Sequence, residues 1–365
     1  MGKRRTRMLV LGGYLGAGKT TLAVNLGRAM NSEHGKNVAI ITNDQGDVLV
    51  DTEYSKDCGF QTAEITGGCF CTNFEGFVHK ARDLVGSGRP DIIIAEPIGT
   101  STNIMGSVVA PLRSLYPEEF SVAPFCVAVD CVRALGIMEG GKERNEESVD
   151  LIPEHQIRDA ESVVLTKTDL VGKDVLAEIK KKVLGLVPGA DIYETTSMDL
   201  GSLAPLCEML LSDKESEKAP VGDDNRIFAF EKAKLGWYSG THELTPTGDV
   251  DMYGLCTDLL RGVAKSYGPQ SIVHVKVIIE SPEAAAKMSL VEETMQVDDV
   301  HGSRYMRSPG RLVLNARVVS PPKRLEEVMG DLVGDAAAKY PFTYKKVSEK
   351  CFMPKPESPS HFFFE

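Results

Sequence analysis

Short apolar runs alternate with longer stretches of helical periodicity from Met8 to about Ser197. The runs are rich in β-branched residues and lie at residues 8–11, 38–42, 91–95, 124–130 and 162–166. Several of them are apolar on both faces, as the strands of a parallel sheet are when helices cover each side. The pattern predicts an α/β domain over residues 1–211, with a wound sheet and helices on both of its faces.

The pattern changes in the second part of the chain. Residues 212–225 are rich in Lys, Glu, Asp and Ser, which predicts a linker. Beyond it, apolar runs at 227–230, 272–279, 311–319 and 342–346 are interrupted by helical patterns at 251–266 and 323–339. The order β-α-β-β-α-β predicts a smaller α+β domain over residues 226–352 with a ferredoxin-like arrangement, followed by a tail at 353–365.

A glycine-rich segment, Gly13-Tyr-Leu-Gly-Ala-Gly-Lys-Thr20, joins the first predicted strand to a helical pattern that begins at Thr21. Backbone N–H groups can wrap phosphates there, because glycine permits the dihedral angles that the wrap requires. Lys19 can reach the β- and γ-phosphate oxygens, and the Thr20 hydroxyl can ligate Mg²⁺. The segment predicts a nucleoside triphosphate site with Mg²⁺, built from Gly13, Gly16, Ala17, Gly18, Lys19, Thr20 and Thr21.

The tetrapeptide Thr166-Lys-Thr-Asp169 follows another predicted strand, at the place where a P-loop GTPase binds its base. A carboxylate at Asp169 can accept two hydrogen bonds from guanine, whereas adenine offers no such pair of donors. The stem of Lys167 can cover the base, and Ser197 can close over the guanine carbonyl. The tetrapeptide alone is also a good helix entry, but its position relative to the P-loop favours binding of GTP and GDP.

Two further segments are expected on the γ-phosphate side. Glu96 and Gly99 follow the strand at 91–95, so that Glu96 is placed to hold Mg²⁺ through water and the Gly99 N–H to sense the γ-phosphate. Residues 43–46, with Asp51, would form a first switch segment, although Asn-Asp-x-Gly is equally a turn composition. We expect the catalytic residues to be Lys19, Asp44 and Glu96.

The segment Gly67-Gly-Cys-Phe-Cys-Thr72 lies between these two switch segments. Thiols one residue apart are not expected to close a disulfide without strain, but Cys69 and Cys71 can both turn toward one soft cation such as zinc. They supply half of a tetrahedral shell, which leaves Cys58, Glu64, His79 or a second subunit to complete it. The alternative is that both are small core residues. Core positions are also expected for Cys126, Cys131, Cys207, Cys256 and Cys351.

Charge and composition exclude some classes of protein. A net charge of −11 argues against a protein that binds nucleic acid by neutralising its phosphates. No apolar run approaches the length of a membrane-spanning helix, and the basic start leads into the glycine-rich loop instead of a signal peptide. We therefore expect a cytoplasmic protein without a membrane anchor. The eight cysteines are too few and too scattered for a disulfide scaffold.

Taken together, the P-loop, Gly-Gly-Cys-Phe-Cys, Glu-Pro-Ile-Gly and Thr-Lys-Thr-Asp-Leu strongly resemble the CobW-type GTPases of the SIMIBI class. The stretch at 155–160 also looks like the family's approach to its base-binding motif. The resemblance implies GTP hydrolysis coupled to delivery of zinc, cobalt or a metal-containing cofactor such as a corrinoid into a client protein. A homodimer across the nucleotide is an expectation by analogy alone.

The chain departs from the family in three respects. Thr72 stands where the family's Cys-x-Cys-Cys has its last cysteine, Asp44 replaces a glutamate, and the seven histidines are dispersed, with no histidine-rich tract. A second interpretation therefore stays open: a GTP-gated protein that remodels a corrinoid or other metalloenzyme without carrying metal. Residues 360–365 would then either bind that partner or fold back on their own domain. A third, an ATP-dependent kinase, is disfavoured by Asp169.

Overall fold

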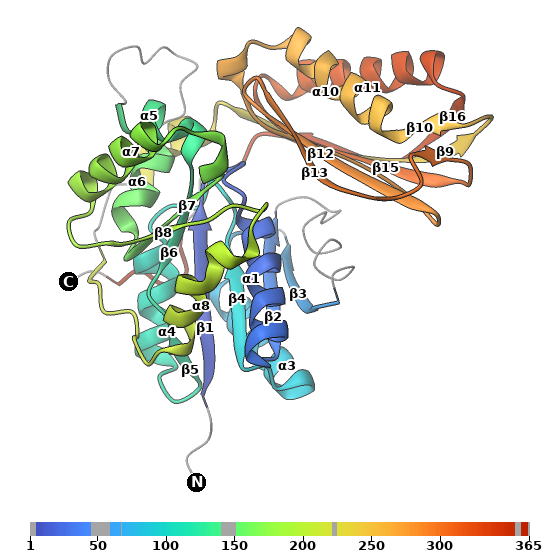
Figure 1. Cartoon of the computed structure of the whole chain (residues 1–365). Coiled ribbons are helices and arrows are strands. Elements are labelled where there is room, and N and C mark those ends of the chain that lie inside the picture. Colours follow the sequence, from blue (N-terminus) through green and yellow to red (C-terminus); the bar gives the residue numbers. More distant parts are fainter. Residues whose placement is uncertain are drawn as a thin grey trace.

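A computed structural model describes residues 5–44, 59–66, 68–139, 151–220, 225–354 and 359–363. Figure 1 shows an α/β domain that begins at the N-terminus and a smaller domain in which two helices cover a sheet. The last described residues return to the α/β domain, where Phe363 donates a backbone hydrogen bond to Gly106. Segments far apart in the sequence therefore meet on the first domain.

The strands and helices of the α/β domain alternate along the chain. Its strands are β1 (Thr6–Gly13), β2 (Val38–Asp44), β3 (Gln61–Thr66), β4 (Ile92–Glu96), β5 (Phe120–Val122), β6 (Cys126–Asp130), β7 (Ser162–Thr166) and β8 (Asp191–Glu194). Its helices are α1 (Lys19–His34), α3 (Phe74–Gly88), η1 (Met105–Val109), α4 (Ala110–Leu115), α5 (Cys131–Glu139), α6 (Leu151–Asp159), η2 (Thr168–Leu170), α7 (Lys173–Leu186), η3 (Leu200–Leu203) and α8 (Ala204–Leu211).

All strand pairs of this domain are parallel, in the order β3-β2-β4-β1-β6-β7-β8, with β5 beside β1. The central strand β1 shows why helices lie on both faces. Its Met8 and Val10 pack into one apolar cluster with α3 and α6, while Leu9 and Leu11 pack into another with α1 and α8. Because alternate side chains of a strand point to opposite faces, a run that is apolar throughout needs cover on each side. The predicted wound α/β fold is confirmed.

The second domain is entered through α9 (Asn225–Lys232). It consists of β9 (Leu235–Pro246), β10 (Val250–Asp251), α10 (Met252–Ser266), η4 (Pro269–Ser271), β11 (Ile272–Ser281), β12 (Ala284–Val291), β13 (Thr294–Gly302), β14 (Tyr305–Met306), β15 (Gly310–Val319), α11 (Pro322–Lys339) and β16 (Phe342–Phe352). Within residues 225–354, six strands form an antiparallel sheet in the order β13-β12-β11-β15-β9-β16. The strands β16, β9, β15 and β11 have the order of a ferredoxin-like fold, as predicted, and α10 and α11 cover one face of the sheet (Figure 1).

Two details of this domain differ from the prediction. The run at 227–230 belongs to the helix α9 and not to a strand, and the first strand is β9. Phe228 of this helix is buried against the ring of His155, and Glu231 accepts hydrogen bonds from the first N–H groups of α6. The hairpin β12–β13 was not anticipated, because Ala284-Ala-Ala-Lys-Met has no strand alternation. It extends the sheet beyond β11.

In the part of the chain that the structure describes, none of the helices combines the length and apolar character that a bilayer crossing requires.

Candidate nucleotide site

The loop between β1 and α1 has the backbone that phosphate binding requires. Gly16 and Gly18 have φ angles of 79° and 80°, in the left-handed region that glycine adopts without steric cost. Gly18 precedes the first turn of α1, so that the free N–H groups of this helix open toward the loop. The two glycines therefore place a ring of N–H donors at the positive end of the helix.

Lys19, Thr20 and Glu96 form a buried cluster at the first turn of α1. The Thr20 hydroxyl donates a 3.0 Å hydrogen bond to the Glu96 carboxylate, and the Lys19 ammonium lies 3.8 Å from the same oxygen. The exposed fractions of the three residues are 7%, 6% and 6%. A hydroxyl and a carboxylate this close fit the oxygen ligands that Mg²⁺ prefers, while Lys19 adds a positive charge for phosphate.

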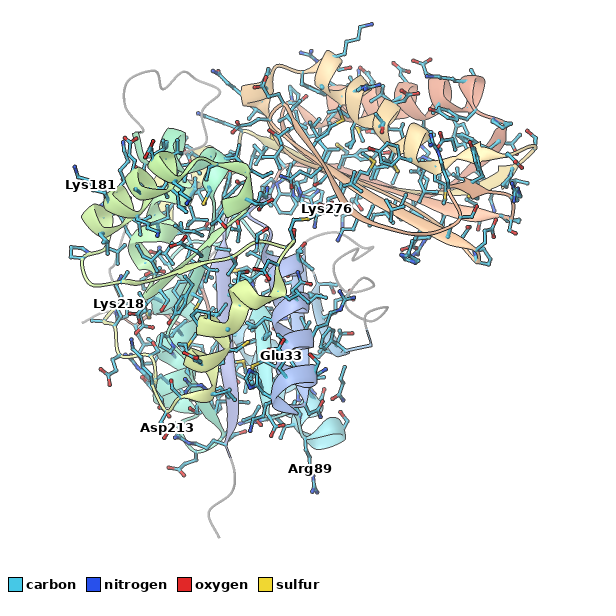
Figure 2. The ribbon with its side chains drawn as sticks, in the orientation of Figure 1. Glu33, Arg89, Lys181, Asp213, Lys218 and Lys276 are labelled. Carbon is cyan, nitrogen blue, oxygen red and sulfur yellow. A yellow bond between two sulfur atoms is a disulfide. The ribbon has the colours of Figure 1, made fainter. Side chains whose placement is uncertain are left out.

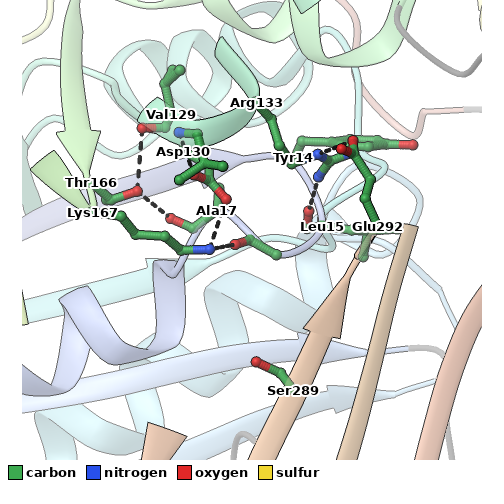
Figure 3. Close-up of polar contacts among 12 residues, drawn as sticks. Tyr14, Leu15, Ala17, Val129, Asp130, Arg133, Thr166, Lys167, Ser289 and Glu292 are labelled. Carbon is green, nitrogen blue, oxygen red and sulfur yellow. Dashed lines mark hydrogen bonds and ion pairs between the residues drawn. The ribbon is translucent and has the colours of Figure 1, made fainter. Parts of the chain in front are cut away.

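The base side of the site is tied to the P-loop by two side chains of one segment (Figure 3). The Thr166 hydroxyl lies 2.9 Å from the Ala17 carbonyl, to which it donates, and the Lys167 ammonium donates to the Gly16 carbonyl at 3.1 Å. Lys167 also forms a 2.7 Å ion pair with the buried Asp130 at the end of β6. Lys167 thus fixes the relative position of the glycine-rich loop and the segment predicted to bind the base, a role that sequence reasoning did not assign to it.

Asp169 lies in η2, at the far end of the same segment. Its carboxylate accepts a 2.6 Å hydrogen bond from the Thr196 hydroxyl, which follows β8. Asp169 and Leu170 are exposed, and Ser197 follows Thr196 directly along the chain. The carboxylate is therefore oriented by a neighbouring loop and open to a ligand.

A cavity of about 330 Å³ joins these groups. Of the residues predicted to bind nucleotide or Mg²⁺, its lining contains Gly16, Gly18, Lys19, Thr20, Thr21, Glu96, Gly99, Thr166, Lys167, Asp169 and Ser197. Gly13 instead lies against β6, where a Cβ atom would come within 2.5 Å of the Ala128 carbonyl oxygen. Asp44 ends β2, and its side chain, like residues 45–46 and Asp51, lies outside the described residues.

Side chains of α6 form hydrogen bonds with the backbone of the segment that follows Glu96. Gln156 donates hydrogen bonds of 3.0 and 2.7 Å to the carbonyls of Gly99 and Ser101. Asp159, one turn further, accepts from the backbone N–H of Met105. The stretch at 155–160 therefore positions the segment that is expected to sense the γ-phosphate.

Asn43 joins the cavity to the cysteine segment. It lines the cavity and is buried. Its side-chain amide donates to the carbonyls of Ile65 and Gly68, at 3.0 and 2.7 Å, and its side-chain oxygen accepts from the Phe70 N–H at 2.9 Å. One buried amide thus fixes the backbone on both sides of Cys69.

Cys69 and Cys71 face each other within a tight turn, and both are buried. The structure joins them in a disulfide, with Cα atoms 5.2 Å apart. The expectation that this spacing disfavours a disulfide is therefore wrong: the Thr72 N–H bonds to the Cys69 carbonyl, and this turn brings the Cα atoms into the ordinary disulfide range. Only a reduced pair could bind metal as thiolates.

The two described candidates for completing ligands, Glu64 and His79, do not form a metal-binding group with this pair. His79 is exposed on α3 and pairs with Asp83, while Glu64 lies on β3 opposite Thr42; Cys58 lies outside the described residues. Among the described residues, no group of three or more His, Cys, Asp or Glu side chains is placed to hold a metal ion. The Thr72 hydroxyl donates to the Cys69 carbonyl at 3.1 Å.

The remaining cysteines occupy apolar surroundings. Cys126, Cys131, Cys207 and Cys256 are buried and Cys351 is half-buried. Burial raises the pKa of Cys126 and of Cys131 to about 12, because a thiolate would lose its hydration there. These thiols stay protonated at neutral pH.

The C-terminal tail lies on the cysteine segment. The backbone N–H of Ser360 donates to the Cys71 carbonyl at 2.7 Å, and its hydroxyl donates to the Thr72 carbonyl at 2.7 Å. The His361 ring packs edge-on against Phe74, 5.0 Å between ring centroids. Residues 359–363 therefore fold back on the protein, but on the first domain and not on the tail's own domain as the second alternative expected.

Sequence reasoning missed the wall of the cavity that the second domain supplies. This wall contains Trp237, His274, Lys276, Lys287, Ser289, Gln296, Val297, Asp298, Asn315 and Arg317. A signal was present in β11 and β15, where polar residues alternate with apolar ones at 274–277 and 314–317. Such alternation indicates a strand with one polar face.

A comparison with profiles of known protein families matches residues 7–194 to the nucleotide-binding domain of CobW, HypB and UreG. The match covers more than half of the chain, including the P-loop, the cysteine segment and Asp169. The chain belongs to the CobW/HypB/UreG family.

Two relatives of this CobW/HypB/UreG chain illustrate how far the similarity extends. The zinc chaperone CobW of Sinorhizobium sp is 30% identical over 195 residues, which are 48% of this chain and 54% of that protein. The zinc-regulated GTPase metalloprotein activator 1 of Dictyostelium discoideum is 26% identical over 269 residues, 64% of this chain and 52% of that protein. The chain thus spans about half the length of the curated relatives it matches.

Among solved structures, HypB from Helicobacter pylori in complex with nickel is similar to this CobW/HypB/UreG chain. It covers 59% of this chain and 92% of its own, at 19% identity and a TM-score of 0.43.

Proposed function

We propose that the chain is a GTP-hydrolysing metal chaperone in which the nucleotide state controls a metal site at Cys69 and Cys71. The observation that carries the proposal is Asn43, which lines the nucleotide cavity and holds the backbone around Cys69 by three hydrogen bonds. A displacement of Asn43 by the nucleotide would move the cysteine segment. Family membership supports the proposal, because the matched domain is described as nucleotide-binding.

The nucleotide chemistry is assigned to the predicted residues. Asp169 binds the guanine, the P-loop N–H groups and Lys19 bind the phosphates, and Thr20 and Glu96 would hold Mg²⁺, which neutralises charge that develops on the phosphates. Preorganised donors lower the barrier because they need no rearrangement as that charge develops. Asp44 stays a proposed catalytic residue.

We propose zinc as the cargo, since two relatives are named for zinc and thiolates are soft ligands that suit it. The metal binds only after the disulfide takes up two electrons and two protons from a reductant and the thiols then lose their protons. We propose that a further ligand comes from Cys58, from the client or from a second copy. Cobalt or a corrinoid stays a proposal with less support, and the client protein is proposed as a metalloenzyme.

The second interpretation, a GTP-gated protein that remodels a metalloenzyme without carrying metal, is favoured by one observation. Cys69 and Cys71 are joined to each other, and among the described residues no third ligand stands beside them. Zinc binding by the reduced protein distinguishes the two functions.

The test uses the purified full chain in the presence of a phosphine reductant. We expect the reduced protein to hydrolyse GTP and bind one zinc ion, and we expect the Cys69→Ser/Cys71→Ser variant to lose the zinc. Cys351→Ser is the matched control, because Cys351 is half-buried and far along the chain from the site. Undiminished zinc affinity in the double variant would contradict the proposed metal site at Cys69 and Cys71. Absence of GTP hydrolysis by the unmodified protein would contradict the proposed GTPase activity.

A further inference from the structure

The sheet of the second domain has two unlike faces. Val275 and Val277 of β11 pack in the core beneath α10 and α11, together with Leu290 and Leu314. The side chains that alternate with them are polar or charged, and belong to His274, Lys276, Lys287, Ser289, Asn315 and Arg317. This polar face lines the nucleotide cavity opposite the P-loop.

Most of the polar face is buried, although α10 and α11 lie on the opposite face of the sheet. The exposed fractions of Lys287, Ser289, Asn315 and Arg317 are 7%, 4%, 8% and 6%. Burial of charged side chains is costly unless they meet partners. Figure 2 shows Lys276 between this sheet and the end of α1 at which the P-loop lies.

The two domains contact each other beside the P-loop, at the turn between β12 and β13. A Cβ atom on Gly16 would lie 2.7 Å from a methyl carbon of Val291, so the turn touches the loop itself. The next residue, Glu292, forms a 2.9 Å ion pair with Arg133 of α5, which also donates to the Leu15 carbonyl at 3.0 Å (Figure 3). Lys276 and Lys287 are therefore held at a fixed place relative to the phosphate loop.

Among the described residues that line this wall, the acidic side chain is that of Asp298 in β13. It accepts a hydrogen bond of 3.1 Å from Ser289. Burial raises its pKa, while the positive charges of Lys287, Lys276 and Lys167 act in the opposite direction. Lysines of both domains thus act electrostatically on one carboxylate in the cavity wall. Arg317 has another role, because it stacks on Trp237 at 3.9 Å and donates to the Tyr238 carbonyl.

We propose that Lys276 and Lys287 bind the phosphates of the guanine nucleotide, so that the sheet of the second domain is the second wall of the nucleotide site. In this arrangement the nucleotide links the two domains, because its phosphates contact the P-loop on one side and β11 and β12 on the other. When the nucleotide is absent, Asp298 balances the charge of the same lysines, and the phosphates must compete with it on binding. The inference rests on the proposed binding of guanine nucleotides.

The test measures the affinity of the full chain for GDP and for a non-hydrolysable GTP analogue by calorimetry. We expect Lys276→Gln and Lys287→Gln to weaken binding of the analogue by about tenfold each, as the loss of a charge-assisted hydrogen bond does. Lys323→Gln, an exposed lysine on α11 of the same domain, is the matched control and should bind as the unmodified chain does. Asp298→Asn should bind more tightly, a gain that misfolding cannot produce.

Hydrogen exchange gives a readout that needs no variant. Amides of β11 and β12 should exchange more slowly when the analogue is bound. The inference would be overturned if the two lysine variants bound the analogue as tightly as the unmodified chain, or if Lys323→Gln lost as much affinity as they do. It would also be overturned if the amides of β11 and β12 exchanged at the same rate with and without the analogue. Failure of the unmodified chain to bind either nucleotide would instead overturn the proposed function.

Discussion

Asp169 is the side chain that we propose determines which nucleotide fits. Its carboxylate offers acceptors only, and the Thr196 hydroxyl uses one oxygen while leaving the group exposed. Guanine presents two donors on one edge, so a carboxylate pairs with both. A base without this pair of donors would leave a charged acceptor unsatisfied, at a cost of about 1–3 kcal/mol.

Asp169→Asn should reverse this preference. An amide presents one donor and one acceptor, which clashes with the 2-amino group of guanine but suits the 2-carbonyl of xanthine. We expect GTP affinity to fall by roughly 100-fold, about 3 kcal/mol, and XTP binding to appear. Calorimetry with GTP, XTP and ATP measures this, and Asp174→Asn in α7 is the control. Retained GTP affinity in Asp169→Asn would contradict the assignment.

The P-loop part of the nucleotide site could be predicted because its motif is local. Gly16, Gly18 and Lys19 lie within one loop, and their chemistry follows from their order along the chain. The fate of Cys69 and Cys71 could not be predicted, because it depends on a turn whose closure is set by the Thr72 backbone. The residue types predict either a metal site or simple core packing for this pair, and not the covalent bond that the structure shows.

At the scale of elements, β2 and the cysteine segment behave as one unit through Asn43. Asn43→Asp keeps the size and the acceptor for the Phe70 N–H, but removes the donor that binds the carbonyls of Ile65 and Gly68. We expect the free energy of unfolding to fall by about 1–3 kcal/mol, since two buried carbonyls lose a partner. We also expect the dependence of zinc affinity on nucleotide state to disappear.

The measurement is a competition titration with a chromophoric zinc chelator, with GDP or a GTP analogue bound. Thermal unfolding of the same samples shows whether Asn43→Asp lowers the stability relative to the unmodified chain. If Asn43→Asp lowers the stability but leaves the nucleotide dependence of zinc affinity unaltered, Asn43 does not link the nucleotide cavity to the cysteine segment.

The tail is a second element that bears on the cysteine segment. Deletion of residues 359–365 removes the hydrogen bonds from Ser360 to Cys71 and Thr72. Local opening then becomes easier, and we expect alkylation of the reduced Cys71 to accelerate by about tenfold. Mass spectrometry of alkylated peptides measures the rate, with Cys351 as the internal reference. Ser360→Ala, which keeps the backbone bond, should have a smaller effect, and equal rates in all three proteins would exclude a protective role.

Strands could be predicted where an unbroken run of apolar residues indicates that both of their faces are buried. The strands β1, β4, β6 and β7 are apolar on both faces, and this fixed both their existence and their parallel pairing. The edge strand β3 mixes polar and apolar residues, and its sequence has no such pattern. In α9, the run Ile227-Phe-Ala-Phe has strand propensity, but the packing of Phe228 against α6 favours a helix.

At the scale of the whole molecule, the relative position of the two domains depends on contacts between residues far apart in the sequence. Arg133 and Glu292 are an example, since neither lies in a recognisable motif. The polar alternation in β11 and β15 indicates strands with one polar face, but not which surface that face meets. Such placement follows from tertiary packing and could not be predicted from local patterns.

The ion pair of Arg133 with Glu292 should contribute modestly to the contact between the domains. Glu292 is about half exposed, so we expect a coupling energy of about 0.5–1 kcal/mol. A double-mutant cycle with Arg133→Gln and Glu292→Gln, followed by chemical unfolding, measures it. Because Arg133 also donates to Leu15, the single substitution there should cost more than the one at Glu292. A coupling energy indistinguishable from zero would show that this ion pair does not stabilise the contact between the domains.

The most direct test of the account is the zinc affinity of the reduced full chain, measured with GDP bound and with a non-hydrolysable GTP analogue bound. We predict about a tenfold difference between the two states, and zinc should change the affinity ratio of the two nucleotides by the same factor, as linkage requires. Equal zinc affinities in the two nucleotide states would contradict the claim that the nucleotide controls the cysteine site.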